Sequence, residues 1–247
     1  MSETSFVGMS LATSLQRQLD VVANNIANAG TAGYKGEQVL FESYTQRGEG
    51  APQGATSFVR DTGSYIDTRA GAMSQTGNPL DVALHGDGWF GYETPEGQRG
   101  YGRDGSFTLD VQGNLTLLSG AKVLGDGGAP IVLPTEGIGT LSITEDGVIS
   151  GTGTGPLARI GVFDIPEIQS YRRMGAGMLT APEGAAAPGA ATGVQVVQGA
   201  LELSNINPVR EMTRLIDVQR AYERTNNLMG NADTLRRDSL KRLSQAV

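Results

Sequence analysis

An apolar stripe near the N-terminus constrains the fold most, because the helix that carries it cannot be stable alone. Its aliphatic side chains recur every three or four residues, which is the period of one face of an α-helix. They are Val7, Leu11, Leu15, Leu19, Val22 and Ile26. Burying such a side chain contributes about 1.5–3 kcal/mol, whereas ordering the backbone costs about 1–2 kcal/mol per residue. The helix therefore needs a packing partner, either within the chain or in an assembly.

Asparagines gather at the C-terminal end of this stripe. Asn24, Asn25 and Asn28 are poor helix formers, because their amides compete for local hydrogen bonds. Three of them within five residues indicate a polar contact surface more than a solvated face. Gly30 follows and is predicted to end the helix as a left-handed cap.

The far end of the chain predicts a second, longer helix. Asn207 followed by Pro208 is a strong helix start, since asparagine caps the first turn and the N–H that proline lacks is not needed there. The helix can run nearly to Val247, about 60 Å at 1.5 Å per residue. Its seam residues alternate at spacings of three and four, as in a coiled coil. They are Leu215, Val218, Tyr222, Thr225, Met229 and Ala232. We therefore expect the two terminal helices to pack as a coiled-coil-like pair.

The residues between the helices predict a mainly antiparallel β domain. Turn-forming pairs separate apolar runs of four to six residues, the length of short strands. The pairs, each interpreted as a hairpin corner, are Asp87-Gly88, Asp104-Gly105, Gly113-Asn114, Asp126-Gly127 and Asp146-Gly147. The 36 glycines also suit many short strands and turns. The predicted fold class is therefore α+β.

Changes in composition divide the chain into five predicted segments. Gln46–Ser57 is rich in Gly and Gln, which indicates a linker or exposed loop. Glu183–Gly193 is low-complexity Ala, Gly and Pro, which indicates a flexible return. The segments are 1–35 (N-terminal helix and motif), 36–71 (extended linker, partly β), 72–182 (β-rich middle domain), 183–204 (flexible return and strand) and 205–247 (C-terminal helix).

Composition excludes several functional classes. A net charge of −7 and a pI near 4.8 argue against a nucleic-acid groove, which needs a basic surface. The chain has no cysteine and a single histidine, which excludes a disulfide framework, thiolate chemistry and metal sites built on cysteine or on several histidines. No catalytic residue, cofactor or metal ligand is predicted. No apolar run is long enough to predict membrane insertion, and the N-terminus lacks the pattern of a cleavable signal. We therefore expect a cytosolic protein, or one exported by a route that needs no such signal.

One motif, Gly86–Gly91, matches the dinucleotide-binding pattern Gly-x-Gly-x-x-Gly by letter. That pattern works by opening a helix whose N-terminus meets the pyrophosphate. Here Tyr92–Gly97 predicts a strand and a turn with proline, which disfavours an NAD-type enzyme. His85 lacks a serine or carboxylate arrangement that would make it a base, and Trp89 and Phe90 are predicted to be core aromatics.

Four motifs in order along the chain resemble those of bacterial flagellar rod and hook proteins. The motifs are Ala23–Asn28 with Gly33–Lys35, similar to the N-terminal signature; Thr76–Leu84 with Gly86–Phe90, similar to the opening of the middle region; Tyr101–Phe107 with Gly113–Leu115 and Val123–Gly125, similar to the segment that follows; and Gly199–Asn207, similar to the C-terminal signature. In its length and in the sequence of Gly77–Phe90, the chain resembles a proximal rod subunit more than the hook protein, which is longer. The distal rod subunit is the alternative. Gly102 and Gly30-Thr31-Ala32 depart from the residues usual in this family. These departures affect the assignment to one kind of rod subunit more than the assignment to the family.

The resemblance implies a non-enzymatic structural subunit of the flagellar rod. Its terminal helices would pack in the inner wall of a torque-transmitting tube, with the β region facing outward. The implied partners are copies of itself, other proximal rod subunits, the distal rod protein and the flagellar type III export apparatus, which would account for the missing signal peptide. The implied location is the rod that spans the periplasm, with neither nucleic-acid binding nor membrane insertion.

The terminal stripes are therefore interpreted as an assembly interface. Head-to-tail contacts between them do not close on themselves and so generate a helical tube, in which buried amides would set the register. Two alternatives are a helical hairpin that only completes one monomer, and a secreted β-rich adhesin with a coiled-coil stalk. The predicted interface residues are Leu11, Leu15, Leu19, Val22, Asn24, Asn25, Ile26, Asn28, Ser204, Asn205, Pro208, Leu215, Val218, Tyr222 and Met229.

Overall fold

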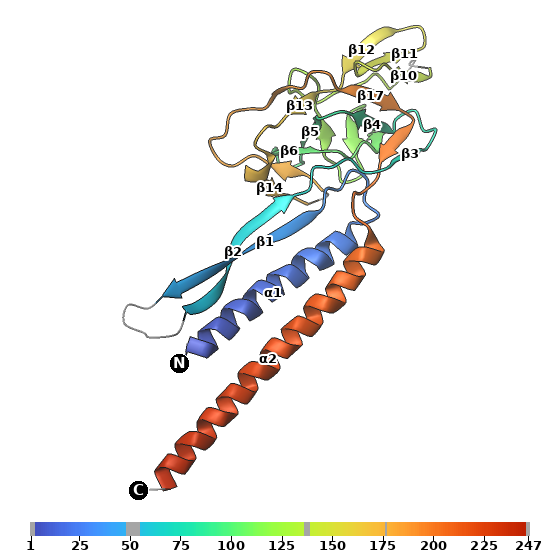
Figure 1. The fold of residues 1–247 in the computed structure, drawn as a ribbon. Helices are drawn as coiled ribbons and strands as arrows, with labels where there is room; N and C mark the ends of the chain where they lie inside the picture. The colour runs from blue at the N-terminus through green and yellow to red at the C-terminus, as the bar shows by residue number, and fades with distance from the viewer. Residues whose placement is uncertain (1–2, 48–54, 136–138, 176, 246–247) are drawn as a thin grey trace. The chain divides into compact units, whose positions relative to one another are not determined.

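The computed structural model describes residues 3–47, 55–135, 139–175 and 177–245, which contain two long helices and many short strands (Figure 1). The chain forms two compact units, and each is described by itself. The helical unit comprises Met1–Ala27, Glu37–Tyr65 and Asn207–Val247, and the β unit comprises Asn28–Gly36 and Ile66–Ile206.

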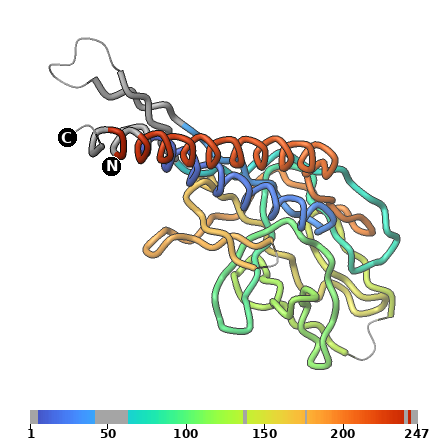
Figure 2. Tube along the Cα trace, turned by 90° about the horizontal axis from the view of Figure 1, so that it is seen from below, coloured from blue at the N-terminus to red at the C-terminus, as the bar shows by residue number. Residues whose placement is uncertain are grey.

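The helical unit is built on an antiparallel helix pair. α1 (Glu3–Ala27) and α2 (Pro208–Gln245) lie side by side in both views (Figures 1 and 2). β1 (Glu37–Arg47) and β2 (Ala55–Ile66) form a two-stranded sheet, and β1 also packs against α1. The Asn207 side-chain oxygen accepts hydrogen bonds from the N–H groups of Val209 and Arg210 at 3.1 Å each, so the predicted N-cap is confirmed. The helix pair is also confirmed, while its coiled-coil-like packing stays a prediction.

Two local predictions in this region are wrong. α1 ends at Ala27 and its cap is not Gly30; the left-handed residue is Gly33, with φ of 65°. A Cβ atom at Gly33 would lie 2.1 Å from the Arg103 carbonyl carbon, so both backbone conformation and close packing require glycine there. The prediction of a loop over Gln46–Ser57 is wrong at both ends, because 46–47 belong to β1 and 55–57 to β2, which pair with each other; 48–54 lie outside the described residues.

The β unit is antiparallel throughout its described pairings, as predicted. One large sheet has the order β14-β15-β6-β5-β9-β8-β7, with β13 joining β5 and β16 joining β13; β10-β11-β12, β17-β4 and β18-β3 form smaller sheets. The strands are β3 (Met73–Gln75), β4 (Val82–His85), β5 (Trp89–Glu93), β6 (Arg99–Gly102), β7 (Phe107–Leu109), β8 (Leu115–Leu117), β9 (Lys122–Val123), β10 (Leu141–Ile143), β11 (Val148–Gly151), β12 (Gly155–Arg159), β13 (Val162–Asp164), β14 (Arg172–Arg173), β15 (Leu179–Thr180), β16 (Gly189–Ala190), β17 (Gln195–Gln198) and β18 (Ala200–Glu202), with the 3-10 helix η1 at Ile168–Ser170.

Three of the five predicted hairpin corners are confirmed. Gly113-Asn114 joins β7 to β8, Asp146-Gly147 joins β10 to β11, and Asp126-Gly127 turns the chain between the bridged residues Leu124 and Pro130. Asp87-Gly88 begins with a bend and Asp104-Gly105 lies in irregular chain, so neither pair is a hairpin corner. The strands that flank each pair do not pair with each other: β4 pairs with the distant β17, and β7 pairs with the strand that follows it, β8.

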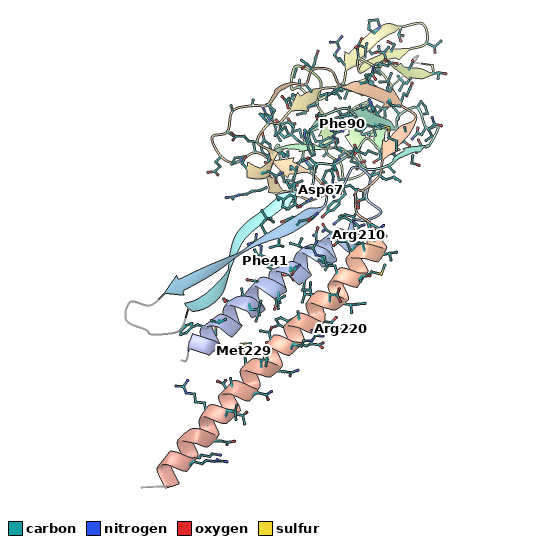
Figure 3. The ribbon with its side chains drawn as sticks, viewed as in Figure 1. Phe41, Asp67, Phe90, Arg210, Arg220 and Met229 are labelled. Carbon is teal, nitrogen blue, oxygen red and sulfur yellow. The ribbon has the colours of Figure 1, made fainter. Side chains whose placement is uncertain are left out.

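The main core of the β unit is a buried aromatic and aliphatic cluster. Phe90 is fully buried and its ring meets Phe107 edge-on with centroids 5.3 Å apart (Figure 3 labels Phe90). Trp89 is also buried, so both predicted core aromatics are confirmed. No helix opens after the Gly86–Gly91 motif; it leads directly into β5. The geometry that a nucleotide loop requires is therefore missing from this described segment.

Candidate assembly interface and the junction of the terminal motifs

The predicted interface residues fall into three groups by exposure. The buried ones are Val22, Asn25 and Val218. The half-buried ones are Leu11, Leu15, Leu19, Ile26, Asn28, Ser204, Asn205, Leu215, Tyr222 and Met229. The exposed ones are Asn24 and Pro208. The structure therefore brings the two stripes together within one chain, and their role between chains stays a prediction.

A close contact between the helices shows how the stripes fit. A Cβ atom at Gly8 of α1 would lie 2.7 Å from Cγ of Met229 on α2, closer than real Cβ contacts come. Figure 3 shows Met229 on the side of α2 that faces α1. A glycine inside a helix costs about 1 kcal/mol relative to alanine. Here the missing side chain makes room for the methionine, so a bulky residue of one helix sits over a small residue of the other.

The Asn25 amide is used within the helical unit. Its nitrogen donates to the Glu37 carbonyl at 2.8 Å, and its oxygen accepts from the Glu37 N–H at 3.0 Å. Both polar groups of one β1 residue are thus satisfied by one buried side chain of α1. The choice of asparagine inside the stripe follows from this pairing, because few other side chains offer a donor and an acceptor together.

The Asn205 amide plays a similar part within the β unit. Its oxygen accepts from the Gly36 N–H at 2.8 Å, and its nitrogen donates to the carbonyls of Asp67 and Arg69 at 2.8 and 3.1 Å (Figure 3 labels Asp67). The C-terminal motif is therefore tied to the end of the N-terminal motif and to the start of the β-rich chain. Asn25 and Asn205 hold their own chain together, which the sequence did not indicate.

A buried group of charges forms the centre of this junction. The Lys35 ammonium donates to Glu202 Oε1 at 2.7 Å and to the carbonyls of Arg69 and Thr68 at 2.9 and 3.3 Å. Glu202 Oε1 also accepts from the Gly71 N–H at 2.9 Å. Lys35 and Glu202 are only 3% and 2% exposed. An ion pair removed from water to this degree is tolerated because hydrogen bonds saturate it.

Arg103 adds a third charge to this group. Its guanidinium donates to Glu202 Oε2 at 3.3 Å and to the Gly86 carbonyl at 2.7 Å, and it stacks over Trp89 at 5.4 Å. Burial lowers the pKa of Lys35 and of Arg103, while Glu202 opposes the shift in both. Lys35 of the N-terminal motif and Arg103 of the middle region thus both contact the carboxylate of Glu202, which belongs to the C-terminal motif. We name Lys35, Arg103 and Glu202 the junction triad.

A second contact holds the N-terminal motif in the β unit. The Arg173 guanidinium lies 4.7 Å above the Tyr34 ring and donates a hydrogen bond to the Lys35 carbonyl. Tyr34 is 2% exposed. The Gly33–Lys35 stretch is therefore an internal part of the β unit.

The sequence did not predict the junction triad, although a signal for it was present. Glu202, the last residue of β18, is buried, while Leu203, which follows the strand, is 43% exposed. In the sequence, Glu202 is a charged residue within the short apolar run 200–203, which makes it a candidate for a buried ion pair. The partner could not be identified from sequence alone, because Lys35 lies 167 residues away.

Two hollows in the β unit, of about 730 and 550 Å³, share the loop 182–188.

Within the described residues, no group of three or more histidine, cysteine, aspartate or glutamate side chains is arranged to hold a metal ion. Among the described helices, none is both long and apolar enough to cross a membrane.

Three family models match the chain in order. Residues 7–35 match the flagella basal body rod protein family, 83–151 match the D1 domain of flagellar hook protein FlgE/F/G, and 197–242 match the C-terminal region of flagellar basal body rod FlgEFG proteins. The chain is 36% identical to the flagellar basal-body rod protein FlgF of Caulobacter vibrioides over 247 residues, which cover 99% of each chain. It is 34% identical to FlgF of Mesorhizobium japonicum, covering 98% of each chain, and 31% identical to the rod protein FlgG of Agrobacterium fabrum, covering 89% of this chain and 91% of that one.

The helix pair, the antiparallel β unit and the joined terminal motifs define an axial protein of the flagellar type. The chain belongs to the flagellar basal-body rod protein family. Within that family it is FlgF-like, since the FlgF relatives named above share more identity with it than the FlgG relative does.

Proposed function

We propose that this chain is a structural subunit of the proximal rod and assembles through its terminal helices into a torque-transmitting tube. Its partners are copies of itself and neighbouring rod subunits, and it reaches the periplasm-spanning rod through the flagellar type III export apparatus. The protein has no enzymatic role in this proposal. The family membership supports the rod assignment, and the five segments predicted from sequence stay part of the proposal.

The observation that carries the assembly role is the set of large apolar side chains left on the outside of the helix pair. On α1, Phe6 and Met9 are 50% and 53% exposed. On α2, Val209, Met212 and Ile216 are 70%, 49% and 48% exposed. Each helix thus exposes its own group of large apolar side chains, and exposed apolar groups of this kind are typical of a protein interface. The intrachain hairpin therefore explains one face of each helix and leaves another for assembly.

A charge placed on this surface tests the proposal. Ile216→Asp leaves the monomer folded, because the side chain is half in solvent, but it puts an ion into the interface of the assembled rod. In cells lacking the native gene, the unsubstituted chain should restore rods and swimming, and Ile216→Asp should restore neither. Val111→Asp is the matched control, since Val111 is 88% exposed in the β unit and should tolerate the charge. Swimming with Ile216→Asp, or rods built without the chain, would contradict the proposal.

The second candidate is a distal rod subunit, which the 31% identity to a FlgG relative favours. The two candidates differ in where the subunit lies along the rod. Labelling the chain in isolated basal bodies distinguishes them: a short band near the base supports the proximal assignment, and a label along most of the rod supports the distal one.

A further inference from the structure

Each terminal helix carries a second line of side chains at helical spacing, and every member is exposed. We call these lines the outer seams. The outer seam of α1 consists of Phe6, Met9, Thr13, Gln16, Asp20, Ala23 and Ala27. The outer seam of α2 consists of Val209, Met212, Ile216, Gln219, Glu223, Asn226 and Gly230. Both lines follow spacings of three and four, the pattern that lets one helix lie along another.

The two outer seams are graded in size in the same direction. In α1 the bulky apolar residues Phe6 and Met9 come first, and Ala23 and Ala27 come last. In α2 the bulky residues Val209, Met212 and Ile216 come first, and Gly230 comes last. If two such helices lie antiparallel, the bulky end of each faces the small end of the other. Helices approach closely where large residues meet small ones, so this alignment suits both seams.

Gly230 is the residue that the single chain does not explain. Glycine inside a helix costs about 1 kcal/mol relative to alanine. Gly8 has a packing reason, because Met229 occupies the space where its Cβ would lie. A Cβ at Gly230 would meet nothing within 4 Å. The antiparallel register that sets Gly8 opposite Met229 also brings Phe6 of another α1 within one residue of Gly230, and Ala27 within one residue of Val209.

We propose that the outer seam of α1 docks antiparallel on the outer seam of α2 of a second copy of this chain, with Phe6 over Gly230 and Val209 over Ala27. This inference rests on the proposed rod function and names the contact that would build the tube. The two seams belong to different helices, so the contact is head-to-tail and does not close on itself. Repeated contacts therefore build a row of helix pairs. In this row, helix contacts within one chain alternate with helix contacts between chains, and both kinds align α1 and α2 in the same register.

Cysteine cross-linking tests the contact directly, because the chain contains no cysteine of its own. Chains carrying only Ala27→Cys and chains carrying only Val209→Cys are expressed together in cells that lack the native gene. Oxidation of isolated rods should give a covalent dimer that is absent when either variant is expressed alone. The matched control replaces Val209→Cys by Arg210→Cys, an exposed neighbour about 100° further around the helix, and should give at least tenfold less dimer.

A bulky residue at the small end of the seam tests the same contact without cross-linking. Gly230→Leu should keep or raise the helix content and thermal stability of the monomer, because leucine favours a helix and meets no atoms there. It should reduce completed rods at least tenfold, because the site for Phe6 is filled. Asn231→Leu places the same leucine side chain at an exposed position off the outer seam and should assemble normally.

The outcomes separate this inference from the proposed function. If the unsubstituted chain builds rods and Gly230→Leu also swims normally, the seam is overturned and the rod function stands. If Gly230→Leu blocks assembly and the cross-link is missing, another rod subunit docks on the outer seam. The proposal that a second copy of this chain docks there is then overturned. If the unsubstituted chain restores no rods, the proposed function itself fails. Both expected results together support the contact.

Discussion

Lys35 matters because it supplies a charge that the buried Glu202 requires. The carboxylate is 2% exposed and would keep only Arg103 and the Gly71 N–H if the ammonium were removed. Breaking a buried ion pair by removing one partner costs about 3–5 kcal/mol. We expect Lys35→Met to lower the free energy of unfolding of the β unit by that amount, measured by urea titration with fluorescence of Trp89, the single tryptophan.

The double variant provides the control for this prediction. Lys35→Met with Glu202→Gln removes both charges of the pair, so its destabilisation should be smaller than the sum of the two single variants. Full additivity would show that the two side chains do not stabilise each other. The ion pair of the junction triad would then contribute nothing to the free energy of unfolding.

Asp104 gives the β unit a pH dependence of predictable sign. Burial raises the pKa of its carboxyl above the ordinary value of 3.8, although hydrogen bonds from Ser106 oppose the shift. Between pH 3.8 and the raised value, the folded state binds more protons than the unfolded state, so stability falls as pH rises through that window. Asp104→Asn cannot ionise and can keep the acceptor oxygen that Ser106 uses. Its stability advantage over the unsubstituted chain should therefore grow from pH 3.8 upward and then level off.

Ser106→Ala tests the cause of this pH dependence. The Ser106 hydroxyl donates to Asp104 Oδ1 at 2.6 Å, which favours the ionised carboxylate. Without the hydroxyl the pKa of Asp104 should rise further, and the decline in stability should extend to higher pH. Unfolding free energies at several pH values between 4 and 7 measure both variants. A pH profile that Asp104→Asn leaves unchanged would contradict the assignment.

At the scale of elements, Asn25 is the connection between α1 and β1. Asn25→Leu leaves the Glu37 N–H and carbonyl without their side-chain partner, which costs about 1–3 kcal/mol for a buried group. We expect faster hydrogen exchange at residues 37–41 and a destabilised helical unit, measured by exchange and mass spectrometry. Gln16→Leu is the matched control, an amide at an exposed position of the same helix, and it should leave exchange in β1 unchanged. Equal effects of the two variants would contradict the proposed connection.

The elements themselves could largely be predicted from sequence, because their signals are local. The stripe from Val7 to Ile26 and the Asn207-Pro208 start each act within one helix, and the structure confirms both helices. Predictions that needed a distant partner were less successful. Asp87-Gly88 is not a hairpin corner because β4 pairs with β17, which begins at Gln195. The junction triad escaped prediction for the same reason, since its members come from three distant parts of the chain.

For the whole molecule, an unequal distribution of stability follows from the two units. The β unit has a large buried core and the junction triad, whereas the helical unit leaves Phe6 and Met9 of α1 and Val209 and Met212 of α2 exposed. α2 is 38 residues long and α1 only 25, so about 13 residues, roughly 20 Å of helix, extend past the paired length. Helix without tertiary packing is marginal in water. The helical unit should therefore be the part that assembly stabilises.

Hydrogen exchange measures this difference directly. In a dilute monomer, residues 5–28 should exchange at least tenfold faster than the core strands of the β unit, such as β8, which serve as the internal reference. In assembled rods the same residues should become as well protected as β8, because docking of the outer seams covers them. Assembled Asn231→Leu should repeat this gain, since its substitution lies off the seam. Strong protection of residues 5–28 in the dilute monomer would show that the helix pair needs no neighbour, and the terminal helices would then not be ordered by assembly.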